Sequence, residues 1–401
     1  MSLVRVLFIS RWFPFPPSNG SKLRVLGLLR GLAQTHEVTL LSFADQTKSE
    51  PTAPERLSLC REVKIVPWRE FNPSGLKAGL GFLSPTPRSI VDTYSPLMER
   101  TIKETLASQR FDVVVASELG SAVYARCFGN VPSVFEEVEV APLYERYTAS
   151  QSVSERVRHG LTWAKHRRYL KSLLPAFASC TVVSERERRL LEGIAPGYHS
   201  VHVIPNCVDL PSYQGSYGEP APGSIVFSGS FRYAPNYQAM IWYLEQVHPR
   251  VRSACPQAHL AVTGDHAGLP LPTSEGVSLT GFVDDVRPYV ARSCVSVVPI
   301  REGGGTRLKA IEAMALGTPV VATSKGVEGL EVRDGEHLLI ADTPEAFSRA
   351  VIRLLGDVDL RRRLASGGRE LVRCRYDWAV VIPRFLDLVE VTARPDQRLV
   401  P

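Results

Sequence analysis

Short runs of apolar, β-branched residues alternate along the chain with longer stretches whose apolar positions recur at helical spacing. In the first half these runs cover 4–10, 38–43, 63–67, 113–117, 133–135 and 180–183. The same rhythm restarts in the second half, at 225–228, 260–263, 277–280, 295–299 and 319–322. Strands that alternate with helices predict parallel βαβ units. We therefore expect two α/β domains, each built on a parallel sheet.

The two series are separated by residues 210–223, which are rich in Pro, Gly and Ser and lack apolar periodicity. Such a segment is typical of a linker. We expect an N-terminal domain over 1–209 and a second domain over 224–375. The tail, 376–401, has apolar positions at helical spacing, and we expect its helix to return to the first domain rather than to cap the second.

The composition is that of a globular protein, with 401 residues of which 44% are hydrophobic and 22% charged. No apolar run approaches the roughly 20 residues of a spanning helix, so no membrane span is expected. The apolar N-terminus lacks a small-residue cleavage site and is predicted to be a buried strand rather than a signal peptide. Seven scattered cysteines without metal-binding spacing favour free thiols in a reducing cytoplasm and no metal site.

Six basic side chains fall within residues 154–172, beside Leu161, Trp163, Tyr169 and Leu170. One interpretation is peripheral contact with an anionic membrane, to which each nearby basic residue contributes about 1 kcal/mol. The alternative is a solvated helix face whose Trp and Leu side chains enter the core. The formal net charge of +6 does not separate the two, because the location of charge matters more than its total.

Loops that follow strands are the places to look for chemistry, because ligands of open α/β sheets bind beyond the carboxyl ends of the strands. The first such loop ends in Asn19 and Gly20 just ahead of a helix, where Asn can cap and Gly lets a ligand approach the helix N-terminus. The second loop, after the first strand of the second domain, carries Gly229 and Arg232. Neither loop has the G-x-G-x-x-G spacing of a dinucleotide site, which disfavours a dehydrogenase.

The third loop is the strongest candidate. A strand is followed by Gly303, Gly304 and Gly305, and then by Thr306, Arg307 and Lys309 at the start of a helix. Cations at a helix N-terminus oppose the helix dipole unless an anion is bound there, and such a local conflict indicates function. We expect the backbone donors, Arg307 and Lys309 to hold a diphosphate. The alternative is an ion pair within the helix between Lys309 and Glu312.

Residues 303–321, GGGTRLKAIEAMALGTPVV, resemble the E-A-M-A-x-G-x-P-V-V signature of glycosyltransferase family 4. Supporting motifs occur in the expected order at 182–186, 203–209, 281–285 and 376–378. The resemblance covers nearly the whole chain. Within the family, the chain resembles sugar transferases of polysaccharide and exosortase-linked gene clusters. It implies the GT-B fold, in which two Rossmann-like domains face each other across a cleft. The second domain is then expected to bind a nucleotide-diphosphate sugar and the first an acceptor, with retention at the anomeric carbon.

The resemblance also assigns roles residue by residue. Glu312 matches the acid that holds the ribose hydroxyls of the donor, and Gly20 matches the first-domain glycine that approaches the donor phosphate. Phe282 and Val283 match the loop that lines the nucleobase, which it contacts through backbone groups more than through side chains.

Two positions depart from the family pattern. Gly304 stands where members usually carry the first acid of an E-x7-E pair, and Glu302, two residues earlier, is the candidate replacement. The usual basic pair after the first strand of the second domain aligns with Ser230 and Pro235, although Arg232 lies close by.

From these departures we infer that Arg307 and Lys309 have taken over part of the phosphate charge. The leaving diphosphate gains negative charge as the glycosidic bond breaks, and cations already in place stabilise it. This chemistry requires no metal and no cofactor.

Carboxylates follow the predicted strand 133–135 in the first domain. Glu137 and Glu139, ahead of Glu136, are candidates to bind an acceptor hydroxyl or to act as general base, and Glu118 is a weaker candidate by the same logic. The alternative is a charged helix start, which the helix dipole favours.

The sequence thus predicts a hexosyltransferase that acts on a glycan or lipid-linked glycan precursor in the cytoplasm, in contact with the inner face of the membrane. Because Gly304 replaces an acid, a non-catalytic nucleotide-sugar sensor or partner subunit stays open, as does a nucleotide-sugar epimerase. The one Asp-x-Asp motif, at 357–359, is predicted to cap a helix rather than bind a metal. No nucleic-acid-binding module is recognisable, and the motifs specify neither base, sugar, acceptor nor linkage.

Overall fold

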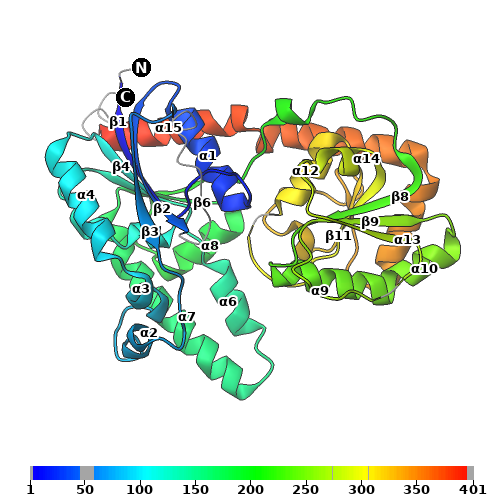
Figure 1. The fold of residues 1–401 in the computed structure, drawn as a ribbon, viewed down its shortest axis with the longest axis horizontal. Helices are drawn as coiled ribbons and strands as arrows, with labels where there is room; N and C mark the ends of the chain where they lie inside the picture. Colours follow the sequence, from blue (N-terminus) through cyan, green and yellow to red (C-terminus); the bar gives the residue numbers. More distant parts are fainter. Residues whose placement is uncertain (1–2, 46–57, 273, 306, 395–401) are drawn as a thin grey trace. The chain divides into compact units, whose positions relative to one another are not determined.

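The computed structural model describes residues 3–45, 58–272, 274–305 and 307–394. The chain forms two compact units, one of residues 1–205 with 382–401 and the other of residues 206–381 (Figure 1). Each unit is built around its own parallel sheet, so the predicted fold class is confirmed.

The sheet of the first unit has seven parallel strands in the order β3-β2-β1-β4-β5-β6-β7. One of its inner strands is buried on both faces, since every side chain from Val6 to Ser10 is buried, as expected for a parallel sheet covered by helices. The strands are β1 (Arg5–Ser10), β2 (Glu37–Asp45), β3 (Glu62–Trp68), β4 (Val113–Ser117), β5 (Ser133–Glu136), β6 (Ser179–Val182) and β7 (Val201–Val203).

The helices of this unit connect these strands. They are α1 (Gly20–Leu32), α2 (Leu76–Leu80), α3 (Arg88–Thr93), α4 (Pro96–Ser108), α5 (Leu119–Ala122), α6 (Ala141–Thr148), α7 (Val153–Leu173) and α8 (Glu185–Ile194), with short 3-10 turns η2 (Ala125–Cys127) and η3 (Leu174–Ala176). The predicted cap of α1 is present, because the Asn19 side chain accepts a hydrogen bond from the Lys22 amide at 2.9 Å.

The final helix, α15 (Trp378–Ala393), begins in the second unit and ends in the first. Its return is fixed by Arg384, whose guanidinium donates to the Val203 carbonyl at 2.9 Å. Farther along, Glu390 lies 3.3 Å from the buried ring of His36. Gly31 of α1 faces Ile382 so closely that a Cβ at this glycine would lie 2.5 Å from the Ile382 Cδ1 atom. The predicted return of the C-terminal helix is therefore confirmed.

The sheet of the second unit has six parallel strands in the order β10-β9-β8-β11-β12-β13. Alternate side chains of its central strand enter separate cores on the two faces, Ile225 and Phe227 on one and Val226 on the other. The strands are β8 (Ala221–Ser228), β9 (His259–Thr263), β10 (Val277–Gly281), β11 (Ser293–Val298), β12 (Val320–Ala322) and β13 (Leu339–Ile340).

The helices of the second unit are α9 (Ala234–Trp242), α10 (His248–Ala254), α11 (Arg287–Ala291), α12 (Leu308–Leu316), α13 (Pro344–Gly356) and α14 (Val358–Leu371), with 3-10 turns η4 (Leu210–Tyr213) and η6 (Lys325–Val327) and π-helical turns η5 (Tyr243–Val247) and η7 (Val372–Tyr376). Asp357 caps α14 by accepting from the Leu360 amide at 2.8 Å, as predicted for the Asp-x-Asp motif.

The chain enters and leaves the second unit at adjacent points. The Val208 amide donates to the Tyr376 carbonyl at 2.9 Å, and the Trp378 amide donates to the Val208 carbonyl at 3.0 Å. This unit therefore begins at Asn206, ahead of the segment 210–223 predicted as a linker, and includes that segment. The difference arises because Pro and Gly residues there form η4 and the start of β8 rather than a free connection.

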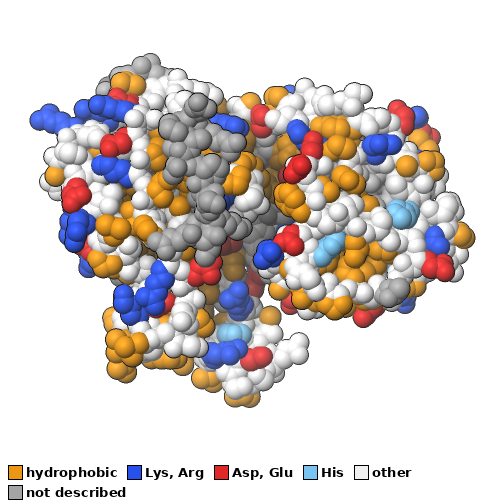
Figure 2. Space-filling view, viewed as in Figure 1, with side chains coloured by type: hydrophobic (Ala, Val, Ile, Leu, Met, Phe, Trp, Pro, Cys, Tyr) orange, Lys and Arg blue, Asp and Glu red, His pale blue; other side chains and the backbone are white. Residues whose placement is uncertain are grey.

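The basic segment 154–172 lies in α7, which packs on the core through Trp163, His166 and Leu170. Five of the six basic side chains are exposed, Lys165 is partly buried, and Leu161 is 63% exposed. Figure 2 shows hydrophobic side chains gathering at the lower end of the first unit, over α2 and α7. Among the helices of the described residues, none combines the length and apolar character needed to span a bilayer.

The contact between α1 and α15 predicts a large effect of a small substitution. Gly31→Ala places a methyl group against the β-branched, buried Ile382, which has little rotamer freedom in a helix, so we expect a loss of about 1 to 3 kcal/mol in the free energy of unfolding. Urea denaturation measures it. Gly193→Ala is the matched control, because this helical glycine has no atom within 4 Å of its added Cβ and gains helix propensity. Equal effects of the two substitutions would contradict the proposed packing.

Candidate functional site

In the second unit the strand order reverses between β8 and β11, which are adjacent in the sheet. At such a switch point the loops that follow the two strands diverge and leave a crevice beyond their carboxyl ends. The loop after β8 carries Gly229 and Arg232, and the loop after β11 carries the glycine run at 303–305. Two of the three loops selected from the sequence therefore meet at one point of one sheet.

The glycine run packs tightly against the start of α9. Gly303 has a φ of 85°, and a Cβ there would lie 2.6 Å from both the Tyr233 hydroxyl and the Pro235 ring. The Tyr233 hydroxyl donates to the Gly304 carbonyl at 2.8 Å. Glycine is thus required at 303 by both conformation and space. Thr306, also predicted to bind the donor, lies outside the described residues.

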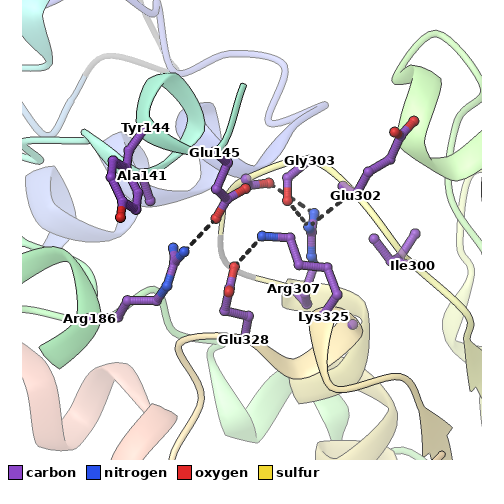
Figure 3. A network of polar contacts seen from close by, with 12 residues as sticks. Ala141, Tyr144, Glu145, Arg186, Ile300, Glu302, Gly303, Arg307, Lys325 and Glu328 are labelled. Atoms are coloured by element: carbon purple, nitrogen blue, oxygen red, sulfur yellow. Dashed lines mark hydrogen bonds and ion pairs between the residues drawn. The ribbon is translucent and has the colours of Figure 1, made fainter. Parts of the chain in front are cut away.

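Arg307 precedes α12 and turns its guanidinium back into the glycine loop (Figure 3). It donates to the carbonyl oxygens of Gly304 at 2.9 Å and of Gly303 at 2.5 Å, and lies 3.3 Å from the Tyr233 hydroxyl. The side chain is 5% exposed, and its Nε has no hydrogen-bond partner among the described residues. Arg307 therefore fixes the path of the loop and leaves a positive charge buried beside it.

Lys309 extends from α12 to the loop that follows β8. Its ammonium donates to the Asn236 side-chain oxygen at 2.7 Å and lies 4.2 Å from the centre of the Phe227 ring. A Cβ on Gly229 would lie 2.6 Å from the Lys309 Nζ atom, so this glycine makes room for the cation. Within the described part of the chain Lys309 has no ion pair, and the alternative pairing with Glu312 is not formed.

The electrostatics at Lys309 are unusual for a lysine. Burial, followed by repulsion from Arg307, lowers the pKa of Lys309 to about 7, while Glu312 acts in the opposite direction. A bound anion would restore the charged form, because it supplies the opposite charge that the protein withholds.

Glu312 lies one turn farther along α12, where its carboxylate accepts a hydrogen bond from the Tyr213 hydroxyl at 3.1 Å. Burial raises the pKa of Glu312, although the bond from Tyr213 and the charge of Lys309 oppose the rise. Tyr213 belongs to η4, within the segment predicted as a linker, and no motif in the sequence indicates this contact.

The remaining predicted donor residues of the second unit lie at the same edge of the sheet but are more open. Arg232 is exposed and pairs with Asp265 in the loop after β9. Phe282, directly after β10, is 74% exposed, and Val283 is partly exposed. The Glu302 side chain is exposed and points away from Arg307, so that only its backbone carbonyl contacts the guanidinium, at 3.4 Å (Figure 3).

The first unit has a second group of polar residues at the carboxyl ends of β4 and β5. Arg24 of α1, beyond Gly20 at the helix start, lies 2.7 Å from Glu136 and 3.5 Å from Glu137. The Ser117 hydroxyl also donates to Glu136, at 2.6 Å. Glu136 is fully buried and so acts as a structural partner of Arg24. Glu139 is exposed.

Glu118 and Glu137 follow β4 and β5 directly, and both have a left-handed backbone, with φ of 60° and 58°. For glutamate this conformation is uncommon and strained. Burial raises the pKa of both, most strongly for Glu137, despite the opposing charge of Arg24. The Trp12 indole donates to Glu118 at 2.8 Å. Glu118, ranked below Glu137 from the sequence, thus shares its environment.

No group of three or more His, Cys, Asp or Glu side chains is placed to hold a metal ion in the described ranges. Figure 3 also shows the ion pairs of Lys325 with Glu328 and of Arg186 with Glu145.

Both units match known families. Residues 19–207 match the family described as Glycosyl transferase 4-like domain, and residues 222–357 match Glycosyl transferases group 1. A phosphatidyl-myo-inositol mannosyltransferase of Mycobacterium tuberculosis is 28% identical over 317 residues, covering 75% of this chain and 79% of the relative. An uncharacterized 44.6 kDa protein in the cps region of Klebsiella pneumoniae is 26% identical over 165 residues, and the match covers 38% of this chain and 42% of that protein.

Solved structures share the fold. Sucrose-phosphate synthase from Thermosynechococcus elongatus superposes with a TM-score of 0.68 at 19% identity, over 96% of this chain and 98% of that chain. Anabaena Alr3699/HepE, solved in complex with UDP and glucose, gives a TM-score of 0.68 at 15% identity, over 96% of this chain and 99% of that chain. Two parallel-sheet units of this kind define the GT-B class. The chain belongs to glycosyltransferase family 4, as the sequence motifs indicate.

The lowered pKa of Lys309 predicts that anion binding weakens as pH rises. Below about pH 7 the lysine is already charged, whereas above it binding must take up a proton, so affinity falls by up to about tenfold per pH unit. Calorimetric titration with inorganic pyrophosphate from pH 6 to 9 measures this. Lys309→Arg is the control, since arginine stays charged and pyrophosphate titrates equally in both experiments. If affinity for pyrophosphate falls equally with pH in both proteins, Lys309 is not the group whose titration weakens anion binding.

The raised pKa of Glu137 predicts a gain in stability on removing its charge. Because the folded chain holds this proton more tightly than the unfolded chain, the free energy of unfolding falls as pH rises above the ordinary glutamate pKa. Glu137→Gln should therefore be more stable than the parent at pH 8, by about 1 kcal/mol or more, and equal to it at pH 4. Urea denaturation at the two pH values tests this, with Glu104→Gln at an exposed position of α4 as control. A loss of stability at pH 8 would contradict it.

Proposed function

We propose that this glycosyltransferase moves a hexose from a nucleotide-diphosphate sugar to a hydroxyl of a glycan or lipid-linked glycan precursor, with retention at the anomeric carbon. The observation that carries the proposal is the Lys309 ammonium, which has no ion pair among the described residues and lies where the loops after β8 and β11 meet. A partly buried cation that forms no ion pair with the described residues is suited to an anionic ligand.

The chemistry follows from the charge that develops in the reaction. As the bond between the anomeric carbon and the phosphate oxygen breaks, negative charge grows on the leaving diphosphate. Lys309, the neighbouring Arg307 and the N-terminus of α12 are already in place and stabilise that charge. Stabilisation of this kind is greater in the transition state than in the bound donor, so it accelerates the reaction. It uses the chain's own cations and requires neither metal nor cofactor.

Glu312 is proposed to hold the ribose hydroxyls, with Tyr213 orienting its carboxylate. Gly229, Gly304 and Gly305 allow the donor to approach the backbone. The nucleobase is proposed to lie against Phe282 and Val283, and this exposure of an aromatic side chain on a loop is consistent with a stacking role.

Arg232 is proposed as a supplementary contact to the donor, and Glu302 as the substitute for the acid missing at Gly304. For the second role the Glu302 side chain must turn towards the loop, because its carboxylate is directed away from Arg307 (Figure 3).

In the first unit we propose that Glu137 accepts the proton of the acceptor hydroxyl as its oxygen bonds to the anomeric carbon. A carboxylate with a raised pKa is a better base near neutral pH than an ordinary glutamate. Glu139 is proposed to bind a further acceptor hydroxyl, and Gly20 to approach the donor phosphate at the start of α1.

Such a transferase fits polysaccharide assembly on the cytoplasmic face of a membrane, with peripheral contact through residues 154–172. The exposed basic side chains of α7 support this placement.

A non-catalytic nucleotide-sugar sensor or partner subunit is the second candidate, favoured by the glycine at 304. Thermal shifts with UDP, GDP, ADP, TDP and their sugars identify the nucleotide, since a ligand stabilises the folded state that it binds. Transfer or slow hydrolysis of the selected sugar then establishes an enzyme, whereas binding without turnover establishes a sensor. Recovery of an isomerised nucleotide sugar without acceptor would identify an epimerase.

Substitution of the buried cation should separate catalysis from folding. Lys309→Ala is expected to lower turnover by about 100- to 1,000-fold, the usual cost of losing one group that stabilises developing charge. Asp357→Ala is the control, because it removes a cap worth about 1 kcal/mol of stability and lies outside the proposed site. Initial rates and urea denaturation of both variants provide the measurement. Unchanged turnover in Lys309→Ala would reject the assignment.

A further inference from the structure

Seven large apolar side chains are exposed at one end of the first unit, over two segments that are distant in sequence. On α2 and the turn that follows it, Leu76 is 82% exposed and Leu83 is 91% exposed. A protein surface rarely exposes so many neighbouring apolar side chains unless it contacts a partner, a ligand or a membrane. We call this group the apolar end; it consists of Leu76, Leu80, Phe82 and Leu83 together with Val153, Val157 and Leu161 of α7.

The two segments are joined by defined polar contacts. The Lys165 ammonium of α7 donates to the carbonyl oxygens of Gly81, Phe82 and Ser84, at 3.0, 2.9 and 2.9 Å. Arg88 donates to the Ala78 carbonyl at 2.8 Å and places its guanidinium 3.7 Å from the centre of the Phe82 ring. The turn at 81–84 is thus held on α7 while its apolar side chains face outward.

The exposed positions of α7 also follow a regular spacing. Val153, Val157 and Leu161 recur every four residues and so share one side of the helix. The side chains that α7 buries, Trp163, His166 and Leu170, lie on the opposite side. Helix α7 therefore has two apolar faces, one in the core and one directed outward.

The basic charge of the chain is concentrated beside this end. Residues 76–88 contain two basic side chains and no acidic one, and residues 153–173 contain six basic and one acidic, a net charge of +7. The whole chain carries +6, so the rest of it sums to −1. In Figure 2 the Lys and Arg side chains border the hydrophobic ones at the lower end of the unit.

We propose that the apolar end inserts into an anionic bilayer, with residues 76–83 as the inserting element and the basic side chains of α7 contacting the lipid headgroups. An apolar surface bordered by cations matches the boundary between acyl chains and anionic headgroups. The peripheral contact of the proposed function rested on the charge of α7 alone. Here α2 and the turn after it supply the apolar part, and the hydrogen bonds of Lys165 hold that turn on α7.

Sedimentation of the full-length protein with phosphatidylcholine vesicles, with and without phosphatidylglycerol, tests the proposal. We expect binding to the anionic vesicles and weaker binding at high salt. Leu80→Asp/Leu83→Asp and Arg167→Glu/Arg168→Glu should each lower the partition coefficient at least about tenfold, since every altered side chain is exposed. The matched controls are Val358→Asp and Arg362→Glu/Arg363→Glu on α14, also exposed, and they should bind as the parent does.

Circular dichroism and thermal stabilisation by nucleotide diphosphate verify that each variant is folded and keeps its donor site. Binding that is equal in all variants, or absent from anionic vesicles, overturns the proposal. The proposal is also overturned if the parent does not bind vesicles and sedimentation velocity shows a dimer that Leu80→Asp/Leu83→Asp dissociates. In that case the apolar end contacts a second copy of the chain. Vesicle binding without sugar transfer would instead count against the proposed function alone, since membrane contact and turnover are measured separately.

Discussion

The second unit is organised around a partly buried ammonium, that of Lys309, which has no ion pair among the described residues. A buried ammonium is costly unless its hydrogens are used and an opposite charge is near. In this unit an amide oxygen from Asn236 and the face of Phe227 receive the Lys309 ammonium, and Gly229 provides the space. The position of the Lys309 side chain therefore explains the residue types at Phe227 of β8, at Gly229 in the loop after it and at Asn236 of α9.

The fold could be predicted largely from the apolar pattern, because buried parallel strands leave continuous apolar runs. Residues 113–117 were predicted to the exact bounds of β4, and the runs at 225–228 and 260–263 fall inside β8 and β9. Two edge strands, β7 and β13, were missed. Each has only two or three residues, and partly exposed positions such as those of Leu339–Ile340 give no apolar run to detect.

The candidate site was predictable where its residues are close in sequence, and not where they come together through folding. The glycine run and the cations after it conflict with local rules for a helix start, and that conflict is visible in the sequence. The contacts of Lys309 with Asn236, of Glu312 with Tyr213 and of Gly304 with Tyr233 join residues 71 to 99 positions apart. The inward turn of Arg307 depends on its rotamer, which spacing does not determine. The sequence therefore predicts that cations gather at this loop, but it does not predict where their side chains point.

The path of the chain has a consequence for biosynthesis. The first unit needs Ile382 and the residues after it, while its other residues all precede position 206. On the ribosome the second unit is therefore complete before the first, in which the α1 surface around Gly31 stays uncovered until Ile382 of α15 emerges. Termination before position 382 would leave the second unit complete and the first unit with an exposed apolar surface, which chaperones and proteases recognise.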